Sequence, residues 1–187
     1  AAEKEIVAFA AKSDVVVLGP GIGLDEEPQV LAKSLVEKIE KPLVLDADGL
    51  TAVGGKLDLL KSRKGRTVLT PHPGEMAKLM GKDISFVQEN RADAAKTVAQ
   101  GTGAVVGLKG HATVVVNPEG NTYINDTGNS GMATGGMGDI LTGMIASFIG
   151  QGIDDFSASI IAVYLHGLAG DIAADKKGPF CMVASDI

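Results

Sequence analysis

The sequence predicts an α/β protein with a mostly parallel central sheet that is covered by helices on both faces. Three observations lead to this fold class. Short runs of apolar, mostly β-branched residues alternate with segments of helical periodicity, and those runs are apolar almost throughout. In addition, the glycine-rich stretch NDTGNSGMATGGMGD, residues 125–139, leads directly into an apolar helical pattern. Apolar strands that alternate with helices are typical of parallel sheets buried between helical layers.

The first part of the chain supplies the parallel strands. Four apolar runs are predicted to form them, at residues 15–18, 43–46, 68–70 and 104–108. Between these runs, residues 28–40 and 86–100 are predicted to form helices, because the first shows one apolar face at helical spacing and the second a helical pattern.

The pattern changes after residue 110. Residues 113–116 and 122–125 flank the turn-forming segment NPEGN, which predicts a β-hairpin. Two long helices are predicted to follow, at residues 139–149 and 155–174, and Gly150 is a plausible stop for the first. Since no repeat or linker divides the chain, residues 1–187 are predicted to form one domain.

Composition excludes several function classes. The 187 residues carry 17 Lys and Arg against 23 Asp and Glu, a net charge of −6, which predicts neither a nucleic-acid nor a membrane partner. No uninterrupted apolar stretch of about 18 residues or signal-peptide pattern is present. Cys181 is the single cysteine, so a disulfide framework and a cysteine-based zinc site are excluded. A cytoplasmic location is expected.

The glycine-rich run is the strongest local signal for a binding site. Its glycines allow sharp turns and bring backbone N–H groups close to a ligand, and the helix that follows adds unsatisfied N–H groups and a positive dipole end. This combination predicts a phosphate cradle. The alternative is a glycine-rich turn in which Asp139 caps the helix, although a cap needs only one residue.

Two further segments follow predicted strands directly, at the sheet edge where open α/β folds bind ligands. GPGIG, residues 19–23, is either a tight turn or a wall of the site, and its glycine spacing is not that of the dinucleotide-binding fingerprint. Asp46 and Asp48 follow the next strand. Two alternatives are open for these carboxylates: one of them caps the next helix, or one of them holds Mg²⁺ through water.

Three further histidine or lysine side chains are candidates for the binding site. His72 lies between two prolines after a strand, which presents an imidazole rigidly, with Glu75 three residues on. Lys109 precedes a glycine at a strand end and is either a phosphate ligand or a surface lysine. His166 lies among apolar residues and is interpreted as a histidine packed within its helix.

Together these segments resemble the ribokinase-like superfamily and, within it, the ADP- or ATP-dependent NAD(P)H-hydrate dehydratases. The matching stretches are GPGIG, PLVLDADGL, TVLTPHPGEM, GLKGHATVV and NDTGNSGMATGGMGDILTGMIASFIGQG, which cover most of residues 14–152. The Gly-x-Gly-Asp element is shared by the whole superfamily and identifies only the fold. The combination of TPHPGE, KGHAT and GNSGMATGGMGD is far more specific to the dehydratases.

The resemblance implies an activity and a set of cofactors. Members of this family phosphorylate the ring hydroxyl of the hydrated cofactors NADHX and NADPHX with ADP or ATP and then eliminate phosphate, which restores NAD(P)H. Mg²⁺ is expected to accompany the nucleotide. Asp139 matches the aspartate that contacts the hydrated ring, and it would act as general base on the hydroxyl. Glu75 occupies the place of a metal-linked glutamate in the sugar kinases, which have asparagine where this chain has His72, and the resemblance implies a Mg²⁺ role for Glu75.

The resemblance also implies two groups of binding residues. Substrate contacts are expected from the side chain of Asp139 and from three residues on the loops after the first and third predicted strands: Gly21, Gly23 and His72. Nucleotide contacts are expected from the KGHAT segment and the glycines before Asp139: Lys109, Gly110, His111, Ala112, Thr113, Gly135, Gly136 and Gly138.

Other expectations concern the whole protein. An NAD(P)HX epimerase is an expected partner, fused or separate, and a homo-oligomer is expected. The chain resembles an incomplete domain, since family members begin with a further strand, a glycine-rich turn and a helix, and end with a last helix. The alternatives to a dehydratase are a hydroxyethylthiazole, hydroxymethylpyrimidine or sugar kinase of the same fold, and a non-catalytic nucleotide-binding module.

Overall fold

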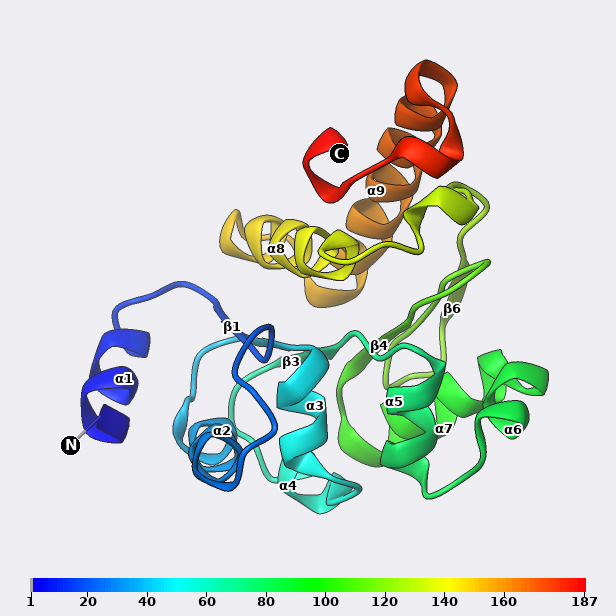
Figure 1. Cartoon of the computed structure of the whole chain (residues 1–187). Helices are drawn as coiled ribbons and strands as arrows, with labels where there is room; N and C mark the ends of the chain where they lie inside the picture. The colour runs from blue at the N-terminus through cyan, green and yellow to red at the C-terminus, as the bar shows by residue number, and fades with distance from the viewer. Residues whose placement is uncertain (1) are drawn as a thin grey trace.

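The computed structural model describes residues 2–187 and shows one six-stranded sheet with helices on both faces (Figure 1). The strands lie in chain order, with β1 to β4 parallel and β5 and β6 joined to β4 as an antiparallel meander. Their bounds are β1 Val16–Leu18, β2 Leu43–Leu45, β3 Thr67–Leu69, β4 Val105–Leu108, β5 Val114–Val116 and β6 Thr122–Ile124. The predicted strands and hairpin are therefore confirmed.

The helices form two layers. The crossover helices α2 to α7 lie below the sheet in Figure 1, and α8 and α9 lie above it. Their bounds are α1 Ala2–Ala10, α2 Glu26–Lys38, α3 Ala47–Val53, α4 Leu57–Lys61, α5 Pro73–Met80, α6 Ile84–Glu89, α7 Arg91–Thr102, α8 Met137–Gly150 and α9 Asp155–Lys177, with the short 3₁₀ turns Ser130–Met132, Pro179–Cys181 and Ala184–Asp186.

Alternation along the strands divides the core between these layers. In β2, Leu43 and Leu45 pack on the side of the crossover helices, whereas Val44 packs against α8 and α9. All three side chains are at most 1% exposed. Because successive residues of a strand point to opposite faces, a strand buried on both faces must be apolar at every position. Burial on both faces therefore explains why β2 has no polar face.

The bounds of all four predicted helices differ from the expectation; the first, predicted at residues 28–40, runs from Glu26 to Lys38. The predicted helix at residues 86–100 is wrong, because Asn90 leaves the helical region at φ −128° and ψ 40° and separates α6 from α7. The side-chain amide and the backbone N–H group of Asn90 both donate to the Phe86 carbonyl, at 2.9 and 3.1 Å, so the break lies in the backbone angles of Asn90 rather than in a lost hydrogen bond. Helix α8 begins at Met137 rather than at 139 and includes Gly150, and α9 continues to Lys177.

Helix α9 is long and apolar enough, by length and composition alone, to cross a membrane. In the structure it packs against α8 and against strands β3, β4 and β5. Ala158, Ala162 and Val163 on its inner face belong to the core. The inner face of α9 is therefore part of the core, while Tyr164, Leu165, Leu168 and Ile172 on the same helix are exposed.

Gly19 marks the closest approach between the β1 and β2 ends of the sheet. It has φ 139°, and a Cβ on it would lie 1.7 Å from the Asp46 carbonyl oxygen. We expect Gly19→Ala to lower the free energy of unfolding by about 1–3 kcal/mol, because rigid backbone must move. Urea unfolding measures this. The matched control is Gly143→Ala on α8, where a Cβ meets nothing within 4 Å, and equal stability of the two variants would contradict the prediction.

Candidate active site

The loops that follow the four parallel strands gather at one edge of the sheet, because the carboxyl ends of parallel strands point the same way. These loops contain GPGIG, Asp46, TPHPGE and KGHAT, as the sequence predicts. The first turn of α8 joins them from the opposite layer. A Cβ on Gly138 would lie 3.5 Å from Lys109 Nζ and 3.6 Å from Asp46 Oδ2, so the start of α8 lies directly over the ends of β2 and β4.

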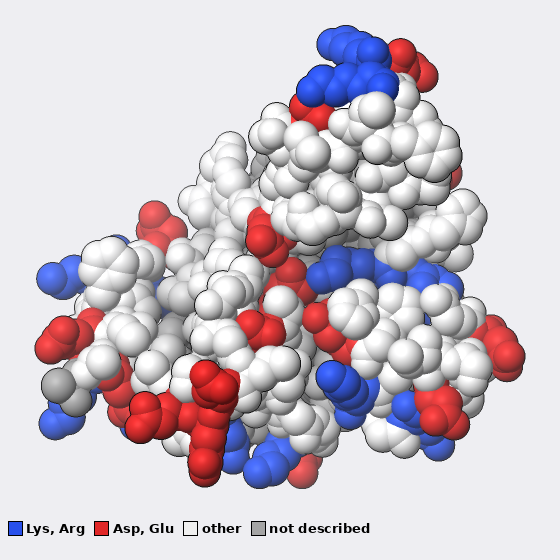
Figure 2. All heavy atoms as spheres, in the orientation of Figure 1, with Lys and Arg blue, Asp and Glu red and all other residues white. Residues whose placement is uncertain are grey.

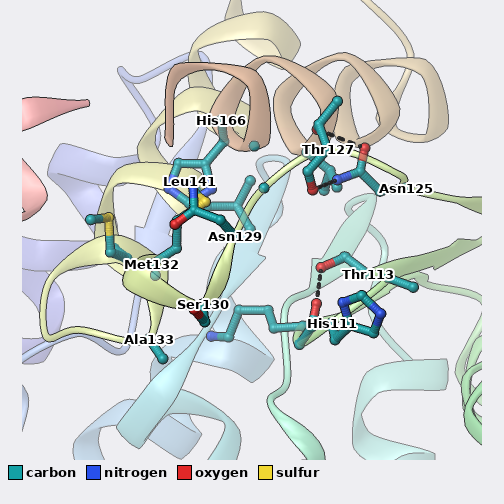
Figure 3. Close-up of a pocket in the computed structure, with 18 of the residues that line it drawn as sticks. His111, Thr113, Asn125, Thr127, Asn129, Ser130, Met132, Ala133, Leu141 and His166 are labelled. Carbon is teal, nitrogen blue, oxygen red and sulfur yellow. Dashed lines mark hydrogen bonds between the residues drawn. The ribbon is translucent and has the colours of Figure 1, made fainter. Parts of the chain in front are cut away.

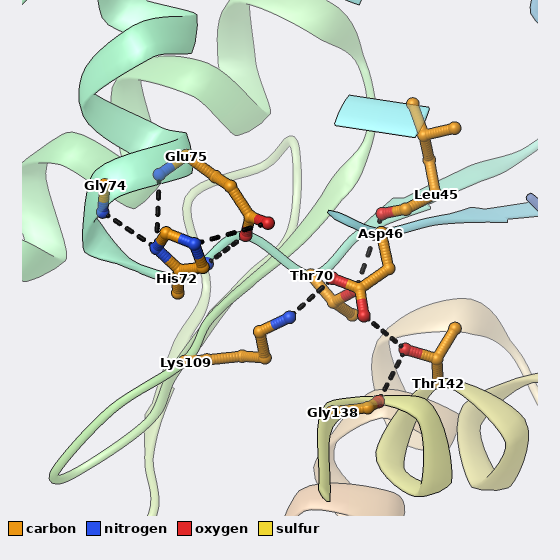
Figure 4. A network of polar contacts seen from close by, with 9 residues as sticks. All are labelled: Leu45, Asp46, Thr70, His72, Gly74, Glu75, Lys109, Gly138 and Thr142. Atoms are coloured by element: carbon orange, nitrogen blue, oxygen red, sulfur yellow. Dashed lines mark hydrogen bonds and ion pairs between the residues drawn. The ribbon is translucent and has the colours of Figure 1, made fainter. Parts of the chain in front are cut away.

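A buried polar network ties these elements together (Figure 4). Lys109 Nζ donates to Asp46 Oδ1 at 2.5 Å, and Thr142 Oγ1 lies 3.0 Å from Asp46 Oδ2 and 2.8 Å from the Gly138 carbonyl. The Asp46 side chain is 2% exposed and that of Lys109 is 19% exposed. Asp46 therefore holds an ammonium group at the start of α8, and Lys109 is not a surface lysine.

The first turn of α8 has the features of an anion site. Gly136, at φ 87°, occupies the N-cap position without a side-chain cap, so the interpretation of Asp139 as a plain cap is wrong. Within residues 2–187 the backbone N–H groups of Gly138 and Asp139 have no protein acceptor. Unsatisfied N–H groups and the positive end of the helix dipole both favour a phosphate here.

A cavity of about 880 Å³ opens beside this turn (Figure 3). It brings together seven of the residues expected to bind ligands: His72, Lys109, Gly110, His111, Ala112, Thr113 and Gly138. The volume is that of a typical small-molecule site. In Figure 2 acidic and basic side chains meet in the hollow between the part that contains α8 and α9 and the rest of the chain.

The remaining expected residues lie outside the lining of this cavity. Gly135, Gly136 and Asp139 flank Gly138 at the start of α8, and Asp139 is exposed in the first turn. Gly21 and Gly23 lie on the loop after β1, where the Gly23 N–H group donates to Asp48 Oδ2 at 2.9 Å. Neither Asp46 nor Asp48 caps a helix with its side chain: Asp46 holds the N-cap position of α3, but its carboxylate faces Lys109.

His72 and Glu75 form a capping box at the start of α5 (Figure 4). His72 Nδ1 accepts from the N–H groups of Gly74 and Glu75, at 3.0 and 3.3 Å, and Glu75 Oε2 accepts from the His72 N–H group at 2.7 Å. Pro73 at the first helical position fits this geometry. Because Nδ1 is an acceptor, the neutral ring carries its proton on Nε2, which lies 3.4 Å from Glu75 Oε1.

A Mg²⁺ ion at this site would be held mainly by the phosphates of a nucleotide, because the described residues form no metal site of their own. In the described part of the chain, residues 2–187, no three His, Cys, Asp or Glu side chains converge to hold a metal. Asp46 is occupied by Lys109 and Thr142, and Glu75 caps α5. Mg²⁺ in nucleotide enzymes takes most of its ligands from phosphate oxygens and water, with one or two carboxylates. A metal role for Glu75 stays a prediction.

The cavity lining also includes residues that were not expected individually as ligand contacts. Asn125, Thr127 and Asn129 belong to the glycine-rich run 125–139 that predicts the site, whereas His166 comes from α9. Asp171 on α9 holds that segment in place, since its carboxylate accepts from the Gly128 N–H group at 2.8 Å and from Asn129 Nδ2 at 3.0 Å. The prediction that His166 packs within its helix is confirmed by its 8% exposure, but it also lines the cavity.

The chain is similar to several proteins whose names indicate a common family. The NAD(P)H-hydrate dehydratase family model matches residues 2–187. The "Bifunctional NAD(P)H-hydrate repair enzyme Nnr" of Thermofilum pendens is 47% identical over 94% of this chain and 33% of that protein. The "ADP-dependent (S)-NAD(P)H-hydrate dehydratase" of Neisseria meningitidis serogroup B is 39% identical over 87% of this chain and 56% of that protein. The chain thus spans a third to a little over half of these relatives.

The chain is also similar to a solved structure. The ADP/ATP-dependent NAD(P)H-hydrate dehydratase of Bacillus subtilis, co-crystallised with ATP and Mg²⁺, superimposes with a TM-score of 0.80 at 33% identity. The match covers 95% of this chain and 64% of that one. The expected ribokinase-like fold is confirmed. With the family model matching nearly every residue, the chain belongs to the NAD(P)H-hydrate dehydratase family.

Proposed function

We propose that the protein containing this chain dehydrates NADHX and NADPHX to NADH and NADPH with ADP or ATP as phosphoryl donor. The observation that carries this proposal is the meeting of the KGHAT loop, Lys109 and the open first turn of α8 around one cavity. Relatives named for this activity and for ADP dependence, and a relative co-crystallised with ATP and Mg²⁺, support it.

The first chemical step is a phosphoryl transfer. The nucleotide binds in the cavity with its terminal phosphates at the N–H groups of Gly138 and Asp139, beside the Lys109 ammonium. The Asp139 carboxylate takes the proton of the ring hydroxyl. The hydroxyl oxygen then forms a bond to the terminal phosphorus, while the bond from that phosphorus to the rest of the nucleotide breaks and AMP (from ADP) or ADP (from ATP) leaves. The amides and Lys109 stabilise the charge on the transferred group. When bound, Mg²⁺ would neutralise charge on the phosphates.

The second step is an elimination. The ring C–O bond breaks, phosphate leaves with the bonding electrons, and a proton is lost from the neighbouring ring carbon, which restores the double bond of the reduced nicotinamide. His72 lines the cavity, so it is placed to contact the substrate. Gly21 and Gly23, held by Asp48, would form the other substrate wall.

Several properties of the whole protein belong to the same proposal. An NAD(P)HX epimerase, fused or separate, is proposed as the partner, since a related protein is named a bifunctional repair enzyme. A cytoplasmic location, a homo-oligomer and a Mg²⁺ requirement are proposed as well.

The test is direct. Incubation of the whole protein with NADHX and ADP, or with ATP, is expected to restore the absorbance of reduced nicotinamide in proportion to the nucleotide consumed. The controls omit the nucleotide or replace it with an analogue whose terminal phosphoryl group cannot be transferred. A protein that binds nucleotide but restores no NADH, or one that instead yields a stable phosphorylated thiazole, pyrimidine or sugar, would overturn the proposal.

A further inference from the structure

Arg91 is a half-buried cation beside the KGHAT loop, and the proposed chemistry gives it no role. It is the first residue of α7, a helix that packs against β4 and β5. Its Nη2 atom donates to the carbonyls of Leu108 and Lys109, at 3.0 and 3.3 Å. Leu108 ends β4, and Lys109 is the first residue of the loop. The guanidinium therefore binds the backbone at the point where the strand passes into the loop.

Helix stability does not explain an arginine at this place. A cation in the first turn of a helix lies at the positive end of the helix dipole, which is unfavourable. Within residues 2–187 no carboxylate pairs with Arg91, and its buried Nε atom has no hydrogen-bond partner. Arginine keeps its charge even here, so the position carries an electrostatic cost. Apart from a contact with Gln88 Oε1 at 3.4 Å, the hydrogen bonds that offset this cost are those to Leu108 and Lys109.

The KGHAT loop has a backbone conformation that needs outside support. Gly110 has φ 132° and Ala112 has φ 53°. The left-handed conformation costs a residue such as alanine about 1–2 kcal/mol, so it persists only where surrounding contacts determine it. Thr113 Oγ1 closes the turn from within, by donating to the Gly110 carbonyl at 3.1 Å (Figure 3). From outside, Arg91 packs against the turn, since a Cβ on Gly110 would lie 3.2 Å from its Nη1 atom.

Lys109 is held in three places, and Arg91 supplies one of them. The Lys109 N–H group donates to the Pro71 carbonyl at 2.8 Å, and its ammonium donates to Asp46. Its carbonyl accepts from Arg91. Lys109 and the four residues after it line the cavity, whereas Arg91 lies behind the loop, outside that lining. Arg91 therefore acts on a bound nucleotide through the loop and not by contact.

We propose that Arg91 is a positioning residue of the nucleotide site, because its hydrogen bonds to two carbonyls hold the KGHAT loop in its binding conformation before a nucleotide arrives. This rests on the proposed function, which places the nucleotide at that loop. A loop that is already ordered loses little conformational freedom on binding, and affinity rises accordingly. Once the nucleotide is bound, its own contacts order the loop, so the chemical step depends little on Arg91.

The test replaces Arg91 in the whole protein. Arg91→Met is expected to weaken ADP binding about 10- to 100-fold in calorimetry, because only a minority of molecules would have the loop in its binding conformation. The kcat for NADH recovery at saturating ADP should stay within about 3-fold of wild type, since the loss lies in binding. Hydrogen exchange of a peptide that covers residues 109–113 should be faster in the free variant, and ADP should remove the difference.

Two further variants separate positioning from charge and from stability. Arg91→Lys keeps the charge but lacks the planar guanidinium, so it should recover at most part of the ADP affinity. Arg63→Met is the matched control. Arg63 donates to the carbonyls of Val36 and Lys41, but it precedes β3 and so lies at the opposite edge of the sheet. Its replacement should lower the free energy of unfolding and leave both ADP affinity and exchange of the loop unchanged.

The outcomes divide clearly. Wild-type ADP affinity in Arg91→Met, full recovery in Arg91→Lys, or a loss confined to kcat would overturn the proposal. If Arg91→Met does not fold, exchange of the loop in free Arg91→Lys decides, and a rate equal to wild type would overturn it. If wild type binds no ADP, the proposed function fails instead, whereas faster loop exchange in the free variants would still show that Arg91 holds the loop.

Discussion

Asp139→Asn is expected to lower the rate of NADH recovery by about 10²- to 10⁴-fold, because it removes a positioned general base. Asp139 lies in the first turn of α8, next to Gly138, and its side chain is exposed rather than paired. The amide of asparagine has nearly the same shape but cannot accept a proton from the ring hydroxyl. Single-turnover measurements with NADHX and saturating ADP should show the loss in the chemical step rather than in KM.

Nucleotide affinity provides the internal control for this experiment. The Asp139 N–H group, not its side chain, belongs to the proposed phosphate cradle, so ADP should bind the variant about as tightly as wild type. Asp93→Asn is the matched substitution, since Asp93 is an exposed residue in the first turn of α7, and it should leave the rate unchanged. A non-catalytic nucleotide-binding module would show no turnover in wild type and no effect of either change.

Strands β1 to β5 were predictable because nearly all of their residues are apolar, and burial on both faces enforces this pattern in β2 to β5. Strand β6 was predictable only from the turn-forming segment before it. The KGHAT residues were predictable as a group because they are contiguous and follow a strand. The break at Asn90 was not predictable, since it depends on the backbone angles of one residue in the middle of a helical pattern. The early start of α8 depends on Gly136 adopting φ 87°, which no periodicity encodes.

The features of the site that were not predicted share one cause. His166 has apolar neighbours in the sequence, which indicate only a packed residue. It reaches the cavity because α9 packs on α8 over the sheet. Asp171 supports the glycine-rich segment across more than 40 residues of chain. The pairing of Asp46 with Lys109 likewise spans 63 positions. Contacts of this kind come from tertiary packing, and a single sequence carries no local signal for them.

Asp46→Ala is expected to lower the free energy of unfolding by about 3 kcal/mol, because it leaves the Lys109 ammonium without its partner. This is the lower end of the range for broken buried pairs, since the Lys109 side chain keeps 19% exposure and can turn toward the water of the cavity. Thr142 also loses its acceptor, although its bond to the Gly138 carbonyl remains. Urea unfolding of the whole protein measures the change.

A double-mutant cycle separates the ion pair from simple loss of packing. Adding Lys109→Met to Asp46→Ala removes the unpaired charge, so the double variant should be more stable than Asp46→Ala alone while it binds ADP weakly. Glu40→Gln breaks the exposed pair with Lys64 and should not change stability measurably. If Asp46→Ala is as stable as Glu40→Gln, the pair is not a structural tie. If the single variant also binds ADP as wild type does, Asp46 does not position Lys109 for phosphate.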